Sequence, residues 1–335
     1  MSESRKIPSL SSPIFILGCH KSGTSLLRSL LDGHGELVVF PREVHFFQHA
    51  GAWIDYPLRG TLPVKRDKAS FLASFVKRMV GPREDVDPYA DSPSSIRYDL
   101  ERFTACFGAF EPKTLKELYE AFVASLYYAL SGAWLPDGAR IVDKSVENAE
   151  YAGVLRWMFP DSSFIHIVRN PYATIVAIRR SRRLKGYPEM DKAARSLHNS
   201  YYYLFKNRMY LDRYLVVRYE DLVSNTRAVM SQVSNFLRMR FTDDLLAPTV
   251  LGEPWQGNST SDMPFPGVSD HPLTAWKESI NDFEVHLVNR IAGPVLQEYG
   301  YDQMVPQSGS RRRVKGETLL TYIKNRVLLS SLIGT

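Results

Sequence analysis

The chain has 335 residues, of which 44% are hydrophobic and 23% charged, proportions that suit a globular protein with a sizeable core. Lys and Arg (42) outnumber Asp and Glu (36), and the formal charge of +6 favours an anionic ligand such as a nucleotide, a sulfated glycan or a lipid headgroup. Two cysteines, Cys19 and Cys106, exclude a disulfide framework and a multi-cysteine zinc site. The polar start and the lack of a long apolar stretch predict no signal peptide and no membrane span, so we expect a cytoplasmic protein.

Strand and helix patterns alternate along the chain. An apolar run at 14–17 that ends at Gly18 predicts a strand, and 24–31 predicts the helix that follows it. The later predicted elements, in chain order, are strand 37–40, helix 115–130, strand 141–142, helix 148–158, strand 164–168, helix 171–183, helix 190–212, strand 214–217 and a helix ending near 236–237. This alternation predicts an α/β fold of the P-loop-like, three-layer α/β/α kind, with a central and mostly parallel sheet.

We expect one domain over residues 1–310. Residues 51–112 show no clear period, and Pro, Gly and Asp are scattered there among short helical patches. We interpret this stretch as a helical and irregular insertion on the substrate side.

A basic tail follows at 311–335. Within it, Leu320, Ile323 and Val327 fall on one helical face that basic residues flank. The pattern predicts an amphipathic helix docked on the body, and peripheral contact with a membrane surface or a partner is the alternative.

The segment Gly-Cys-His-Lys-Ser-Gly-Thr-Ser at 18–25 lies between the first strand and the first helix. Backbone N–H groups and the positive helix end can cradle a phosphate there. The loop resembles a Walker A motif, but that motif places lysine directly after its second glycine, whereas Lys21 precedes Gly23. The best Walker B candidate, Asp143, follows only a very short apolar run. A P-loop kinase is therefore a secondary interpretation, as is a non-catalytic nucleotide- or glycan-binding module.

The order Lys-Ser-Gly-Thr-Ser at 21–25 resembles the 5′-phosphosulfate loop of sulfotransferases that use 3′-phosphoadenosine 5′-phosphosulfate (PAPS). The resemblance implies that Lys21 stabilises the bridging oxygen as the sulfonate leaves. It also implies a cofactor-binding set in the rest of the loop, namely Ser22, Gly23, Thr24 and Ser25. The proline that often precedes the basic residue in this family is His20 here.

Three later segments resemble the same family in the same order. The Arg-Asn-Pro that begins at Arg169 is similar to the 3′-phosphate element, and a guanidinium at the carboxyl end of a parallel strand can bind phosphate bidentately. The family usually carries a serine where this chain has Ala177. The Tyr-Glu-Asp-Leu segment implies that Tyr219 lies near the adenine, and the Trp-Lys pair implies that Lys277 lies near the cofactor pocket.

The segment Glu-Val-His-Phe-Phe at 43–47 resembles an element of heparan-type glycan sulfotransferases, in which the glutamate acts as the base. The attacking acceptor must lose a proton, so a carboxylate or histidine must lie within reach of it. In an extended segment Glu43 and His45 point to the same side, and we expect Glu43 to be the base with His45 beside it. Lys144 matches a Lys-Ser or Lys-Thr element of the glycan and protein-tyrosine branches, which implies contact with the sulfonate or the leaving group.

Together these segments imply a sulfotransferase that moves a sulfonate from PAPS to a hydroxyl or amine of a glycan, lipid or small molecule. No nucleic-acid partner is expected. Gln48 replaces the aspartate often found in the heparan branch, so the acceptor of that branch is not implied by the motif. We also expect no metal, because no His, Cys or carboxylate cluster shows ligand spacing along the sequence.

Overall fold

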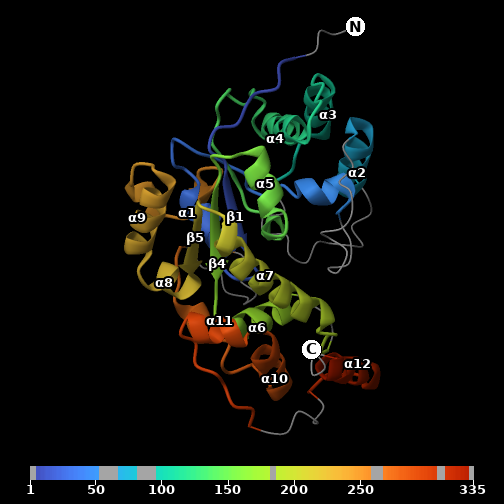
Figure 1. The fold of residues 1–335 in the computed structure, drawn as a ribbon, viewed down its shortest axis with the longest axis vertical. Helices are drawn as coiled ribbons and strands as arrows, with labels where there is room; N and C mark the ends of the chain where they lie inside the picture. The colour runs from blue at the N-terminus through green and yellow to red at the C-terminus, as the bar shows by residue number, and fades with distance from the viewer. Residues whose placement is uncertain are drawn as a thin grey trace.

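The computed structural model describes residues 5–52, 67–80, 96–181, 186–257, 267–307 and 314–331. A five-stranded parallel sheet forms its centre, in the order β2-β3-β1-β4-β5 (Figure 1). The strands are β1 (Ile14–Gly18), β2 (Val38–Val39), β3 (Ile141–Asp143), β4 (Ser163–Val168) and β5 (Tyr214–Arg218). In the middle strand, β1, Ile14 pairs with Val142 of β3 and with Ser163 of β4. The predicted parallel α/β sheet is confirmed.

Helices cover both faces of this sheet. Alternate side chains of a strand point to opposite faces, and the apolar side chains on each face need covering. Ile14 and Ile16 belong to one apolar cluster, and Phe15 and Leu17 belong to another. The first cluster includes α1 (Thr24–Leu31), α8 (Tyr219–Ser224) and α9 (Thr226–Leu237), and the second includes α4 (Leu115–Ser131) and α5 (Ala152–Met158). Both β1 and β4 are buried along their whole length, as expected for strands covered on both sides. This is the predicted three-layer arrangement.

A third apolar cluster lies beyond the carboxyl end of β4, below the sheet in Figure 1. Its helices are α6 (Pro171–Ser181), α7 (Asp191–Tyr210), α10 (Asp282–Ile291) and α11 (Gly293–Glu298). Ligands of open α/β sheets bind at the carboxyl ends of the strands, so these helices form one wall of the region where a site is expected.

The C-terminal helix α12 (Leu319–Ser331) docks on the body through Asn325, whose Oδ1 accepts a hydrogen bond from Met190 N at 2.9 Å. Four apolar residues of α12 are exposed: Leu319, Leu320, Ile323 and Val327. The predicted apolar face is therefore not the docking face, and membrane contact through it stays a prediction. None of the helices in the described part of the chain has the length and apolar character that crossing a membrane requires.

Two helices occupy the middle stretch that showed no clear period, α2 (Lys68–Val80) and α3 (Leu100–Gly108). Residues 53–66 and 81–95 of the same stretch lie outside the described residues. Aromatic side chains one turn apart on each helix pack around Phe122 of α4, with Phe75 and Phe103 at a centroid distance of 4.1 Å. The helical part of the prediction for this stretch is confirmed by α2 and α3, whose aromatics supply the helical spacing, and the position of the stretch on the substrate side stays a prediction.

Two predicted boundaries differ from the structure. The helix expected at 148–158 is α5, which begins at Ala152 after a 3₁₀ turn at Val146–Ala149. The segment after β5 is two helices, α8 and α9, because the chain turns out of helical geometry at Asn225. The side chain of Asn225 then caps α9 by accepting a hydrogen bond from Ala228 N.

Candidate active site

The loop between β1 and α1 has the backbone geometry of an anion cradle. Lys21 and Gly23 have φ values of 64° and 103°, both in the left-handed region. Ser22 closes the loop internally, since its Oγ donates to Cys19 O at 2.7 Å. A Cβ at Gly23 would lie 2.3 Å from Cδ2 of Tyr219, so no larger residue fits there without displacing that ring. The loop amides are thereby gathered at the N-terminus of α1, where an anion is favoured.

Arg169 and Tyr219 both meet this loop. Arg169 follows β4, and its Nη1 donates to Lys21 O at 2.9 Å while its Nη2 donates to Pro272 O at 3.0 Å. Its guanidinium also lies 4.5 Å from the centre of the Tyr219 ring. The Nε atom is buried and has no hydrogen-bond partner among the described residues. The structure thus brings together three separate sequence segments at the carboxyl end of the sheet.

A cleft of about 980 Å³, open to solvent, lies in front of the loop. The predicted cofactor residues that line it are Lys21, Gly23, Thr24, Ser25, Arg169 and Tyr219. Two others do not line it. Ser22 is used within the loop, and Lys277 is exposed with its ammonium 6.0 Å from the centre of the Trp276 ring. Trp276 itself lines the cleft, so the late Trp-Lys segment reaches it through the aromatic residue and not through the lysine.

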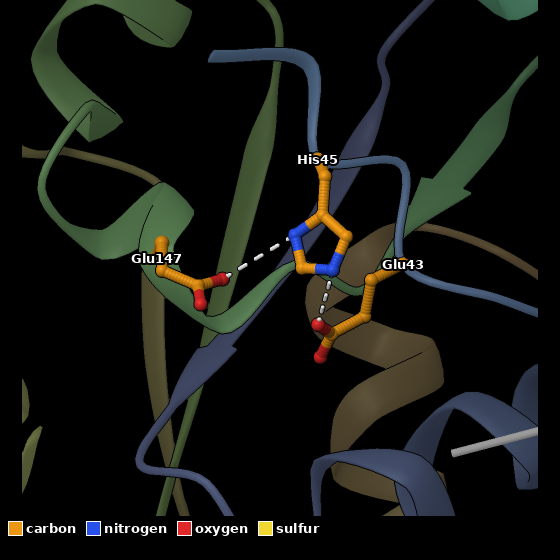
Figure 2. A group of neighbouring side chains, drawn as sticks. All are labelled: Glu43, His45 and Glu147. Atoms are coloured by element: carbon orange, nitrogen blue, oxygen red, sulfur yellow. Dashed lines mark ion pairs between the residues drawn. The ribbon is translucent and has the colours of Figure 1, made fainter. Parts of the chain in front are cut away.

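A second group of side chains lies beside the loop and contains alternating acids and bases. Figure 2 shows the imidazole of His45 between the carboxylates of Glu43 and Glu147. His45 Nε2 lies 2.9 Å from Glu43 Oε2, and His45 Nδ1 lies 3.7 Å from Glu147 Oε2. At the two ends, Lys144 Nζ lies 2.7 Å from Glu43 Oε1 and His20 Nε2 lies 3.4 Å from Glu147 Oε1. Because His20 directly precedes Lys21, this acid–base cluster adjoins the phosphate loop.

The acid–base cluster forms through a turn and not through the extended segment that we expected. His45 has a φ of 50°, so the backbone is left-handed there and residues 43–45 are not a strand. The backbone N–H groups of Val44 and His45 both donate to Ser145 Oγ, at 3.0 and 3.1 Å. The expected extended geometry was wrong, yet Glu43 and His45 do meet because Ser145 holds the turn.

Asp143 fixes the position of Ser145, which holds this turn. It accepts hydrogen bonds from Ser145 Oγ at 2.6 Å, from Asn148 Nδ2 at 2.8 Å and from Tyr119 Oη at 3.0 Å. The carboxylate is completely buried. Burial raises its pKa, and this effect outweighs the three hydrogen bonds, which lower the pKa. As both of its oxygens are already occupied by protein donors, Asp143 is poorly suited to the magnesium-binding role of a Walker B aspartate.

Burial and ion pairing shift the pKa values of Glu43 and Lys144 in opposite directions. Burial alone would raise the pKa of Glu43, but the positive charges of Lys144 and His45 outweigh it and lower the pKa to about 2. The side chain of Lys144 is 0% exposed, and burial lowers the pKa of its ammonium against the attraction of Glu43. Glu43 is therefore an ionised carboxylate held by a buried cation.

The same cluster has the spacing of a possible metal site. Glu43, His45 and Glu147 each offer one ligand atom, and these atoms lie within 4.8 Å of one another. The sequence showed no such cluster, because Glu147 comes from a different part of the chain and no motif marked it. Lys144 and His20 already contact the two carboxylates, so a metal ion there would compete with these two side chains.

A left-handed phosphate loop, an arginine at the next strand end and a buried acid–base cluster define an α/β enzyme that transfers a group from a nucleotide. The profile of the Sulfotransferase family matches residues 13–243, which is more than half of the chain. The chain belongs to this family, and it is a sulfotransferase.

A solved structure supports the fold. The sulfotransferase domain from the curacin biosynthetic pathway aligns over 88% of this chain and 99% of its own, with 20% identity and a TM-score of 0.53. The sulfotransferase domain of the Synechococcus PCC 7002 olefin synthase aligns over 82% and 91%, with 21% identity and a TM-score of 0.47. No curated protein sequence matches significantly.

Proposed function

We propose that this sulfotransferase moves the sulfonate of PAPS to a hydroxyl or amine of a glycan, lipid or small-molecule acceptor, with Glu43 as the general base. The observation that carries the proposal is the contact of Glu43 with Lys144 and His45 directly beside the phosphate loop. The proposal assigns Glu43 as the proton acceptor and Lys144 as the cation at the point where the acceptor substrate and the leaving group meet. General-base and electrostatic catalysis need this combination.

The reaction follows from these positions. The acceptor oxygen or nitrogen attacks the sulfur, a new bond to sulfur forms, and the bond from sulfur to the bridging phosphate oxygen breaks. The electron pair leaves with 3′-phosphoadenosine 5′-phosphate (PAP), and the acceptor proton passes to Glu43. Lys21 and Lys144 meet the charge that develops on the leaving oxygen, and each such donor contributes about 3 kcal/mol.

The low pKa of Glu43 implies a change of partner during this reaction. A carboxylate with a pKa of about 2 accepts a proton poorly at neutral pH, because a general base works best when its pKa is near the working pH. Lys144 is the main cause of the lowering. We propose that the Lys144 ammonium turns to the sulfonate when PAPS binds. The pKa of the buried Glu43 then rises, and the base strengthens only in the loaded enzyme.

The cleft provides the nucleotide site of this proposal. The loop amides, with the hydroxyls of Thr24 and Ser25, take the 5′-phosphate at the N-terminus of α1. Arg169 takes the 3′-phosphate at the end of β4, and the ring of Tyr219 lies beside the adenine. The aromatic side chains that line the cleft suit a flat base, and the cations Lys21 and Arg169 suit the phosphates attached to it.

We propose that no metal takes part, although the acid–base cluster has a suitable spacing. In this proposal Lys21 and Lys144 supply the positive charge that a metal would bring to the leaving group, and the carboxylates of Glu43 and Glu147 already contact Lys144 and His20.

An acceptor screen with sulfur-labelled PAPS tests the proposed function. Glycans, lipids, phenols, amines and peptides are incubated with the full chain, and labelled product is separated from PAPS. Label should appear in at least one acceptor class with equal release of PAP. The same product should be strongly reduced with the Glu43→Gln variant, while PAP binding persists.

A further inference from the structure

One face of α6 forms a wall of the nucleotide cleft. The residues of this helix that line the cleft are Ala173, Val176, Ala177 and Arg180. Positions three and four apart share one side of a helix, so they form a continuous stripe. Three of them have no hydrogen-bonding side chain. Arg180 is the exception, and it stands one turn beyond Ala177.

The guanidinium of Arg180 is available to a ligand. Arg180 is exposed, and no hydrogen bond or ion pair joins it to any other residue in the described part of the chain. The neighbouring Arg179 behaves differently, because its Nε donates to Glu284 Oε1 at 2.5 Å and its Nη2 donates to Ser279 O at 2.8 Å. Arg179 is therefore used in contacts within the protein, whereas Arg180 lines the cleft.

The direction of helical side chains places Arg180 over the position of Ala177. A side chain in a helix leans toward the N-terminus and covers the surface of the preceding turn. At Ala177 that surface offers only a methyl group. A long arginine from the next turn can therefore supply a donor where the shorter residue has none.

The cleft also needs a second cation for a phosphate at this end. Each Nη atom of Arg169 already donates one hydrogen bond to a backbone carbonyl, of Lys21 and of Pro272, and its buried Nε has no partner among the described residues. A phosphate monoester carries close to two negative charges at neutral pH. One partly committed guanidinium compensates only part of that charge.

We propose that Arg180 binds the 3′-phosphate of the nucleotide together with Arg169 and makes the enzyme selective for 3′-phosphorylated adenosine nucleotides. The inference rests on the proposed function, since it assumes a nucleotide with a 3′-phosphate in the cleft. It assigns a specificity-determining role to a residue outside the recognisable segments of the family.

Calorimetric titration of the full chain with PAP and with AMP, which lacks the 3′-phosphate, tests this role. Arg180→Ala should weaken PAP binding by about 10- to 100-fold, the loss expected for one charge-assisted contact, and should leave AMP binding unchanged. Arg180→Lys should keep part of the preference, because the charge stays but the bidentate geometry is lost. The matched control is Arg240→Ala, which removes the same charge from an exposed residue outside the cleft lining and should change neither affinity.

The possible results separate this inference from the proposed function. If the wild type binds PAP and AMP equally well, both are overturned. If the wild type prefers PAP and Arg180→Ala keeps the full preference, the role of Arg180 is overturned and the proposed function stands. An equal loss of PAP affinity in Arg240→Ala would show a general effect of net charge and would also overturn the role of Arg180.

Discussion

Lys144 Nζ lies 2.7 Å from Glu43 Oε1, and this ion pair joins a completely buried ammonium to the carboxylate that we assign as the base. The pair links two segments far apart in the sequence, the turn after β2 and the end of β3. Removing one partner of a buried pair leaves the other charge uncompensated, which commonly costs about 3–5 kcal/mol. If Glu43 is the base, both catalysis and folding depend on this contact, and variants must separate the two effects.

Glu43→Gln should lower the free energy of unfolding, because it removes the carboxylate that lies 2.7 Å from the buried ammonium of Lys144. The double variant Glu43→Gln, Lys144→Met removes both charges and should regain most of that stability while staying inactive. Denaturant unfolding of the wild type and both variants measures this. A Glu43→Gln protein as stable as the wild type would contradict the buried ion pair.

The pH dependence of stability should reveal the lowered pKa of Glu43. Its pKa falls from 4.5 to about 2 on folding, so the folded state holds the ionised form more strongly than the unfolded state. The resulting stabilisation is complete above about pH 4.5 and is lost as the pH falls toward 2, with a total of about 3 kcal/mol. The difference in unfolding free energy between the wild type and Glu43→Gln should therefore shrink between pH 5 and pH 2. A difference that is constant over this range would contradict the assignment.

Gly23→Ala should abolish nucleotide binding. The backbone there has a φ of 103°, and the new methyl group would lie 2.3 Å from the Tyr219 ring, so the loop must distort. Calorimetry with PAP should show a loss of at least about 100-fold, since distortion misplaces several loop amides at once. Gly35→Ala is the matched control, because a Cβ at Gly35 meets nothing within 4 Å. Equal affinities of the two variants would argue against the loop as the phosphate site.

Chelation of metal ions should leave activity unchanged. In the proposed reaction Lys21 and Lys144 supply the positive charge at the leaving group, and the carboxylates of the acid–base cluster already contact Lys144 and His20. Sulfonate transfer is measured before and after treatment with EDTA. A strict requirement for a divalent cation would contradict the proposal that no metal takes part.

The nucleotide side of the site could be predicted from the sequence because its parts are local. The loop at 18–25 is one continuous segment that follows β1, and Arg169 directly follows β4. Because β1 and β4 are neighbouring parallel strands, their carboxyl ends bring the loop and Arg169 together. Lys277 failed to reach the cleft because it is on the exposed side of its turn, which local sequence does not reveal.

The acid–base side was only partly predictable, since tertiary contacts build it. Glu147 reaches His45 and His20 through the 3₁₀ turn after β3, and no motif marks it. The turn at His45 depends on hydrogen bonds to Ser145, which is distant in sequence. Arg180 had no sequence signal either, because basic residues are frequent around it and only the cleft distinguishes it from Arg179.

The most direct test of the central claim is a single-turnover measurement of label transfer from PAPS to an acceptor found in the screen. The enzyme is in excess over labelled PAPS, so the rate reports chemistry on bound nucleotide. The wild type should transfer the sulfonate, and Glu43→Gln should be about 100- to 10,000-fold slower with nearly unchanged affinity for PAP. Transfer by Glu43→Gln at the wild-type rate, with His45→Ala inactive, would contradict Glu43 as the base and assign that role to His45.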